Sequence, residues 1–386
     1  MFSRHHPPSA RHRHPRGLRA ASPRVTGERF FLVGDWIHPG DEDVPAGPRV
    51  VAHSPSQRRP IAPPPLGRRP LFSVMVPTFA PDERLRRTLE AVLAQAPGPE
   101  AMQIAVVDDA TPSMDIAAFV RSIDATGRVE VHRHARRSGI AGNWNRALDG
   151  ARGRYVHLLH QDDYVLPGFY DRIAAGFRAA PTAGMAFCRS RIVDGRDRHI
   201  KTTSRQRWLP GVIGAWLPRI AERQRVQTPA AVVARAAYER LGGFREDLCH
   251  ALDWEMWVRI AAAYPVWYEP RALAVYRRHT TNESHRLLTN GAVWPDLLQA
   301  IDLNARRLPA GEQDRIRLRS VRWYAGSALR TAEQQLARGE LDAAGRTLDH
   351  LPDWLRLLPA GGDGSPVLRR IGRLRDRLRT ARRRAA

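Results

Sequence analysis

The stretch LFSVMVPTFAPDERLRRTLEAVL, residues 71–93, decides the fold class. Its first seven residues form an apolar run of the kind found in strands that are buried on both faces. Apolar residues at helical spacing follow, and they predict a helix; they are Leu85, Leu89, Val92 and Leu93. A buried strand that leads into a helix is typical of βαβ units, in which parallel strands are joined by crossover helices.

The same alternation continues downstream. Apolar runs predict strands at 104–109, 129–134 and 155–160, with helices between them near 116–123 and 143–151. This order favours right-handed crossovers and an α/β fold with a mainly parallel sheet flanked by helices. Ligands of such sheets bind beyond the carboxyl ends of the strands. Later segments predict three more strands, at 185–193, 230–235 and 273–279. They also predict a helix at 253–263 and an irregular loop at 201–224.

Composition divides the chain into four parts. Residues 1–66 are rich in Pro, Arg and His and are expected to be disordered. The α/β domain is expected at 67–285 and a small helical C-terminal region at 286–360. The tail at 361–386 carries an apolar helical face surrounded by arginines. That tail has two interpretations: a helix that continues the helical region, or a peripheral anchor on anionic lipid.

The formal net charge of +23 indicates attraction to anionic lipid, phosphate-bearing substrates or nucleic acid, without choosing among them. No nucleic-acid-binding motif is recognised, so no specific nucleic acid is expected as a partner. The first strand is not followed by GxGxxG, which argues against a dinucleotide-dependent oxidoreductase. It is not followed by a glycine-rich basic loop either, which argues against a sugar-nucleotide pyrophosphorylase. The chain shows no signal-peptide core and no apolar run near ~20 residues. We therefore expect a cytoplasmic protein, possibly peripheral at the inner face of the cell membrane.

Three acidic positions carry the expected chemistry. Asp162 and Asp163 follow a buried strand, and such a pair suits Mg²⁺ or Mn²⁺, although a helix cap would also use it. Asp108 and Asp109 end another strand, where a carboxylate can accept an N–H from a nucleobase or simply stabilise a turn. Asp253 stands at a helix start, where it is either a cap or a general base.

Five segments together resemble the successive motifs of family 2 glycosyltransferases, in the family's order and over about 210 residues. They are VPTFAPDERLRRTLEAVLAQ, AVVDDATP, GIAGNWNRALDGARGRYVHLLHQDD, LGGFREDL and ALDWEMWVRIA. The resemblance implies the Rossmann-like GT-A fold, an inverting mechanism, a DxD-type metal site with Mn²⁺ or Mg²⁺, and a nucleoside-diphosphate sugar donor, with a UDP- or dTDP-sugar favoured. It also implies cell envelope glycan biosynthesis with a glycan or lipid-linked acceptor. The alternative is a non-catalytic GT-A-like or basic protein that binds anionic ligands.

The resemblance also assigns expected roles. Asp253 falls at the catalytic base, Asp163 at the metal ligand and Asp162 at a donor contact. His279 is a tentative metal ligand, with a backbone-bonded strand end as its other interpretation. The remaining expected donor contacts are Pro77, Thr78, Phe79, Asp108, Asp109, Gly139, Asn143 and Gln227, and the expected acceptor contacts are Gly243, Phe244 and Trp254.

Overall fold

The computed structural model describes residues 59–64, 69–112, 114–357 and 364–385, all within one compact unit that runs from Leu32 to Ala386. The segment 1–66, for which disorder is predicted, lies outside these residues except for 59–64.

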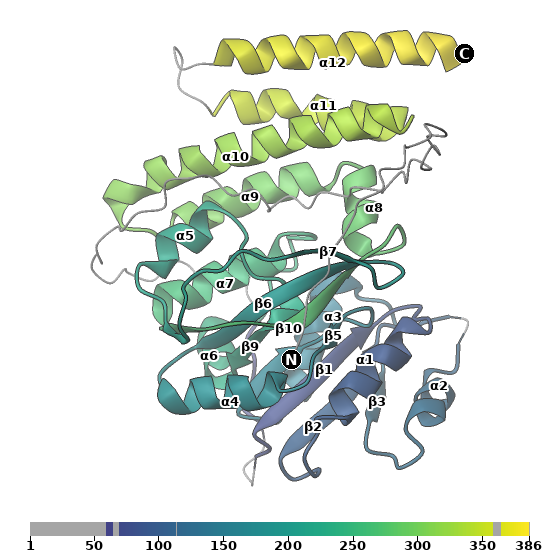
Figure 1. The fold of residues 1–386 in the computed structure, drawn as a ribbon, viewed down its shortest axis with the longest axis vertical. Coiled ribbons are helices and arrows are strands. Elements are labelled where there is room, and N and C mark those ends of the chain that lie inside the picture. The colour runs from purple at the N-terminus through teal and green to yellow at the C-terminus, as the bar shows by residue number, and fades with distance from the viewer. Residues whose placement is uncertain (1–58, 65–68, 113, 358–363, 386) are drawn as a thin grey trace, which may run out of the picture. The chain divides into compact units, whose positions relative to one another are not determined.

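A ten-stranded sheet organises the unit (Figure 1). Its order is β3-β2-β1-β4-β9-β6-β10-β5, with β7 on β6 and β8 on β10. The strands β1, β2, β3, β4, β6 and β10 run in one direction, while β9 and the short strands β5, β7 and β8 oppose their neighbours. The bounds are β1 Phe72–Thr78, β2 Met102–Asp108, β3 Glu130–Arg133, β4 Tyr155–Leu158, β5 Tyr164–Val165, β6 Met185–Asp194, β7 His199–Thr202, β8 Gly211–Val212, β9 Ala231–Ala234 and β10 Val266–Arg278.

Helices cover both faces of the sheet because its strands carry apolar side chains on both sides. In β1, Val74 and Val76 join the core under one group of helices, and Met75 joins the core under the other group. The first group is α1 (Arg84–Leu93), α2 (Ile116–Ile123) and α4 (Phe169–Ala179). The second group is α3 (Gly139–Gly150), α5 (Trp216–Glu222), α6 (Arg235–Leu241) and α7 (Leu252–Ala263). The predicted α/β class with a mainly parallel sheet and a helical C-terminal region is confirmed.

The helical C-terminal region packs directly on this second layer. Its helices are α8 (Glu283–Thr289), α9 (Val293–Ala305), α10 (Ala310–Ala337), α11 (Leu341–Leu355) and α12 (Gly364–Ala385). Figure 1 shows α9 to α12 stacked beyond α5 and α7, and α9 and α10 contact both the sheet domain and the next helix. The sheet and these helices lie in one unit, and the predicted boundary at 285 falls inside α8, whereas the boundary at 360 lies outside the described residues.

The apolar face of the predicted tail is largely buried in α12. Ile371, Leu374 and Leu378 are less than a tenth exposed and belong to the core shared with α10 and α11, whereas Leu368 is 58% exposed. Burial of each such side chain stabilises the fold by roughly 1.5–3 kcal/mol. The helix therefore continues the C-terminal region, as the first interpretation of the tail expects.

The expectation of an irregular loop at 201–224 is partly wrong. This segment contains the short strand β8 and the helix α5. Seven helical residues give too short a periodic pattern to be recognised, and α5 packs on α7 and α10, which come later in the chain. No helix in the described ranges is both long and apolar enough to span a bilayer.

Candidate active site

The acids at the end of β2 are bound within the chain. Asp108 accepts hydrogen bonds from the hydroxyl and the backbone N–H of Thr111, at 2.5 and 3.1 Å. Asp109 accepts from the Ser138 N–H and hydroxyl at 2.8 and 2.7 Å and from the Gly139 N–H at 2.9 Å. Both side chains are buried. Asp109 thus fixes the start of α3, and a carboxylate with about four acceptor positions keeps one for a ligand.

Helix α3 brings Asn143 to the ends of the two central strands. Its side-chain amide donates to the carbonyl of Val107 at 3.1 Å and to that of Thr78 at 3.4 Å. The Asn143 Oδ1 atom is buried and has no partner among the described residues. Because buried polar atoms are nearly always paired, this oxygen marks a place for a donor group from a ligand.

The predicted nucleotide loop after β1 lies at the same edge. Pro77 and Thr78 are buried, and the Thr78 hydroxyl donates to its own strand at the Val76 carbonyl. Phe79 is half-buried, with the guanidinium carbon of Arg137 3.8 Å from its ring centroid. The loop therefore lies next to Asn143, which donates to the Thr78 carbonyl, and the half-buried Phe79 ring follows it.

The second pair of acids forms a compact group with an imidazole. His160, Asp162 and Asp163 each offer one ligand atom, and these atoms lie within 4.8 Å of one another. His160 Nδ1 is 3.4 Å from Asp163 Oδ2, and its ring packs at a tilt of 31° against Trp144, with the ring centroids 4.9 Å apart. Asp163 Oδ2 and His160 Nε2 are both buried and lack hydrogen-bond partners in the described structure. Two carboxylates and an imidazole with unpaired donor atoms fit a divalent cation.

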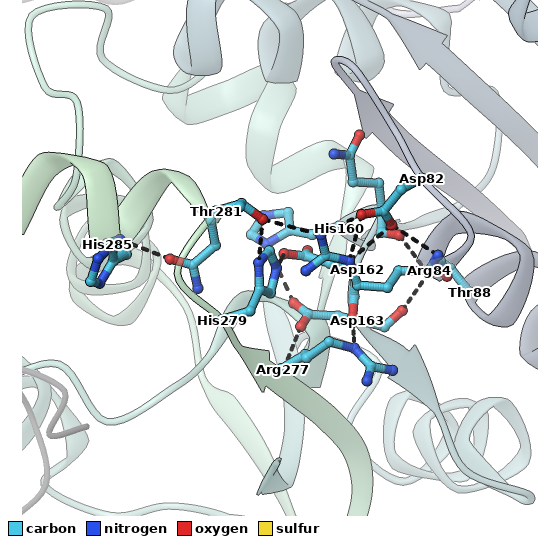
Figure 2. Close-up of polar contacts among 12 residues, drawn as sticks. Asp82, Arg84, Thr88, His160, Asp162, Asp163, Arg277, His279, Thr281 and His285 are labelled. Carbon is cyan, nitrogen blue, oxygen red and sulfur yellow. Dashed lines mark hydrogen bonds and ion pairs between the residues drawn. The ribbon is translucent and has the colours of Figure 1, made fainter. Parts of the chain in front are cut away.

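The backbone of this acidic loop is held from three sides. The Gln161 side chain exchanges two hydrogen bonds with the backbone of Phe79, at 2.9 and 3.1 Å. Figure 2 shows Thr88 of α1 and Arg277 of β10 reaching the same loop. The Thr88 hydroxyl donates to the carbonyls of Gln161 and Asp163, and the Arg277 N–H donates to Asp163 Oδ1 at 2.8 Å. These contacts point Asp163 inward before any ion binds.

The two acids of the loop differ in proton affinity. Burial, followed by the charge of Asp162, raises the pKa of Asp163 to about 6. Burial also acts to raise the pKa of Asp162, but the hydrogen bond to His279 and the nearby imidazoles hold that pKa below its usual range. One carboxylate therefore stays ionised while the other holds a proton in mildly acidic solution, and a bound cation would displace that proton.

His279 contacts the acidic group from its side. Its Nε2 lies 2.7 Å from Asp162 Oδ2 and its Nδ1 lies 2.8 Å from the Thr281 hydroxyl (Figure 2). Both ring nitrogens thus have a protein partner, and neither interpretation of His279 made from the sequence included Asp162. Its tentative role as a metal ligand stays a prediction.

Asp253 lies in the first turn of α7 and faces the residues that follow α5. Its Oδ2 accepts from the Gln224 amide at 2.9 Å and from the Thr228 hydroxyl at 3.2 Å, and its Oδ1 accepts from the Trp254 N–H at 2.6 Å. Burial raises the pKa of Asp253 to about 6. The charge of Asp253 also contributes to raising the pKa of His160, which places the two in one electrostatic neighbourhood. A half-buried carboxylate near neutrality can accept a proton.

The Gly-Gly-Phe turn is a structural support. Gly242 has φ +82° and ends α6, and its N–H bonds to the Tyr238 carbonyl. A β-carbon on Gly243 would collide with the amide oxygen of Asn145, which accepts the Phe244 N–H at 2.7 Å. Phe244 is fully buried against Trp144. The acceptor contacts expected of Gly243 and Phe244 are therefore wrong, because tight packing on α3 leaves both residues inside the core.

The acceptor contact expected of Trp254, with its ring stacked on a sugar, is also wrong. The side chain is 1% exposed, its indole N–H donates to the Ile220 carbonyl at 2.6 Å, and its ring packs 5.2 Å from Tyr324. Helices α5 and α10 cover it. Gln227 is half-buried and precedes the short 3₁₀ turn Thr228–Ala230, and the amide that reaches Asp253 belongs to Gln224 instead.

Sequence reasoning missed four residues at this site. His160 has a readable signal, because an imidazole two residues before an acid pair is a plausible ligand spacing. Trp144 gives no such signal, because its contact with His160 is made only in the fold. Gln224 and Thr228 come from a segment that carries no periodicity and meet Asp253 only through α5.

Comparison with known proteins finds a matching family and several relatives. Residues 73–242 match the profile of glycosyl transferase family 2. The uncharacterized protein MT1568 of Mycobacterium tuberculosis is 29% identical over 57% of this chain and 71% of its own length. The succinoglycan biosynthesis protein ExoU of Rhizobium meliloti is 24% identical over 53% of this chain, which spans 62% of ExoU.

Among solved structures, TarS 1–349 of S. aureus in complex with UDP-GlcNAc superposes with a TM-score of 0.56 at 17% identity. The match covers 80% of this chain and 90% of that one. This likeness extends through the sheet and into the helices that follow it. Residues 73–242 therefore match glycosyl transferase family 2, and the fold of the chain resembles that of TarS.

Proposed function

We propose that the chain is an inverting glycosyltransferase of the hexosyltransferase type, with Asp253 as its general base. The observation that supports this most directly is that Asp253 is near enough to His160 for its charge to help raise the pKa of that imidazole, which belongs to the group formed by His160, Asp162 and Asp163. A base for the acceptor and a site for the leaving diphosphate are the two parts that a single displacement needs. No second carboxylate is required as a covalent nucleophile, unlike in a retaining glycosidase.

In this mechanism Asp253 removes the proton from an acceptor hydroxyl as that oxygen attacks the anomeric carbon. The bond from that carbon to the diphosphate breaks, the nucleoside diphosphate leaves with the electron pair, and the anomeric configuration inverts. Gln224 and Thr228 hold Oδ2 of Asp253 in place by donating to it. His160, Asp162 and Asp163 would hold Mg²⁺ or Mn²⁺, which supplies charge stabilisation to a departing diphosphate when bound.

The donor is proposed to be a nucleoside-diphosphate sugar, with UDP- or dTDP-sugars first in order. The TarS structure contains UDP-GlcNAc, which makes that donor the natural starting point. The acceptor is proposed to be a glycan or a lipid-linked glycan, as the name of ExoU, a succinoglycan biosynthesis protein, suggests for a relative. Peripheral membrane contact through the tail would be electrostatic, because the apolar face of α12 is largely buried.

The test is nucleoside diphosphate release from a panel of UDP-, dTDP- and GDP-sugars with Mn²⁺ or Mg²⁺. We expect slow hydrolysis of one donor by the wild type and loss of at least ~100-fold in Asp163→Ala and Asp253→Asn. Mn²⁺ binding, followed by electron paramagnetic resonance, should weaken in Asp163→Ala and persist in Asp253→Asn. Asp353→Asn, which changes an exposed acid of α11, is the matched control. Full turnover in Asp253→Asn would rule out this residue as the base.

A further inference from the structure

A short exposed loop between β7 and α5 carries an apolar tip. Trp208 is 79% exposed and Leu209 is 69% exposed, and Val212 follows at 41%. Among the described residues, the remaining large apolar side chain of this kind is Leu368 on α12. An exposed Trp-Leu pair is costly in water, and such patches commonly mark contact surfaces.

The stem of this loop is ordered by hydrogen bonds. The Gln206 N–H donates to the buried Tyr268 hydroxyl at 3.0 Å, and the Arg207 guanidinium donates to the Val212 carbonyl at 2.7 Å. Strand β8 then pairs with β10. The stem is therefore closed on itself and anchored to the sheet, and residues 208–210 project beyond it. The ordered stem therefore holds the apolar tip in its exposed position.

The charge around the tip has one sign. From 203 to 225 the sequence contains five arginines and a single acid, Glu222. Glu222 is paired with Arg319 at 3.1 Å. Arg205 lies over the Trp208 ring at 4.4 Å, so one face of the indole is already covered by a cation. Indole rings and arginine side chains with an adjacent leucine suit a bilayer interface, where the ring sits at headgroup level and the guanidinium meets phosphate.

We propose that the loop tip formed by Trp208 and Leu209, with Arg205 beside it, inserts into the surface of an anionic lipid bilayer. A sugar platform is less favoured, because one Trp208 face is occupied and a neighbouring leucine adds nothing to glycan binding. The tip leads directly into α5, whose Ile220 carbonyl binds the indole of Trp254 next to the base. The surface would thus present Asp253 to acceptors held in the membrane, a consequence that rests on the proposed function.

The experiment measures binding of the full chain to vesicles of phosphatidylcholine with and without 30% phosphatidylglycerol, by flotation. We expect binding to the anionic vesicles only, and a loss of about 10-fold or more in the double variant Trp208→Ser, Leu209→Ser. Arg205→Gln should weaken binding by about threefold to fivefold and reduce its salt dependence. Leu368→Ser removes a comparably exposed leucine from α12 and should bind like the wild type. Unchanged thermal melting of each variant establishes that the fold is kept.

Three results would overturn the proposal. The first is no binding of the wild type to anionic vesicles. The second is unchanged binding of the double variant, which would assign adsorption to arginines elsewhere. The third is a double variant that binds vesicles like the wild type but has a raised KM for a soluble oligosaccharide acceptor, which would make Trp208 a glycan contact. Vesicle binding is measured without turnover, and donor hydrolysis is measured without vesicles. Failure of the membrane proposal can therefore be distinguished from failure of the proposed glycosyltransferase function.

Discussion

At the scale of single residues, the proton affinity of Asp253 sets a pH limit on activity. Burial raises its pKa to about 6, so the carboxylate needed as a base is lost as the pH falls through that value. We expect kcat/KM to fall about tenfold for each pH unit below 6 and to level off above it. The profile should be measured at saturating Mn²⁺, so that ionisation of Asp163 does not limit binding. The residual activity of Asp253→Asn serves as the reference, because it should lack this limb. A flat wild-type profile from pH 5 to 8 would contradict the assignment.

Gln161 ties the acidic loop to the segment that follows β1. Its amide both donates to and accepts from the Phe79 backbone. Gln161→Glu can no longer donate, and it adds a negative charge beside Asp162. We expect it to lower stability by about 2 kcal/mol without metal, and more than Gln161→Ala does. Thermal melting with and without Mn²⁺ checks this, since bound Mn²⁺ should narrow the gap between the two variants. Equal melting of both variants without metal would argue against the charge effect.

At the scale of elements, α9 fixes the start of α7, the helix that carries the proposed base Asp253 and is called the base helix below. The Asp296 carboxylate accepts three backbone N–H groups, from Cys249, His250 and Ala251, at 2.6, 3.0 and 2.7 Å. These residues come just before Leu252, where α7 begins. Asp296→Ala would leave three donors without a partner, each costing about 1–3 kcal/mol if buried.

We therefore expect Asp296→Ala to lower kcat by at least ~10-fold while Mn²⁺ binding stays unchanged, because the metal-binding loop belongs to other elements. Asp296→Asn keeps one acceptor oxygen and should be intermediate. Steady-state kinetics beside an Mn²⁺ titration separate these effects. Parallel loss of kcat and of Mn²⁺ binding would indicate general unfolding instead of misplacement of the base.

At the scale of the whole molecule, the sheet and the C-terminal helices form one unit. The buried Glu255 and Arg259 pair on α7 is joined by Arg307 from the segment after α9, and the Gln224 N–H donates to the hydroxyl of Tyr324 on α10. We expect a single unfolding transition, with far-ultraviolet circular dichroism and tryptophan fluorescence giving the same midpoint. Two separate midpoints would show that the helices are an independent domain.

The sequence allowed the sheet and its acids to be predicted because these signals are local. Buried strands appear as apolar runs, and both acid pairs directly follow such runs, as at Asp109 and Asp163. The wrong expectations concern residues whose surroundings come from distant segments. Trp254 is covered by α5 and α10, and Phe244 by α3, and neither neighbour can be read from the residues beside them.

The contact between Asp296 and the start of α7 also matters for engineering. One way to build a chimaera would be to exchange the C-terminal helices as a module on a constant sheet domain. In this protein, Asp296 of α9 accepts the hydrogen bonds that hold the start of the base helix. A C-terminal module from another protein would lack this aspartate. A workable graft would have to carry residues 249–263 together with α9 and α10, which makes the base helix part of the exchangeable cassette.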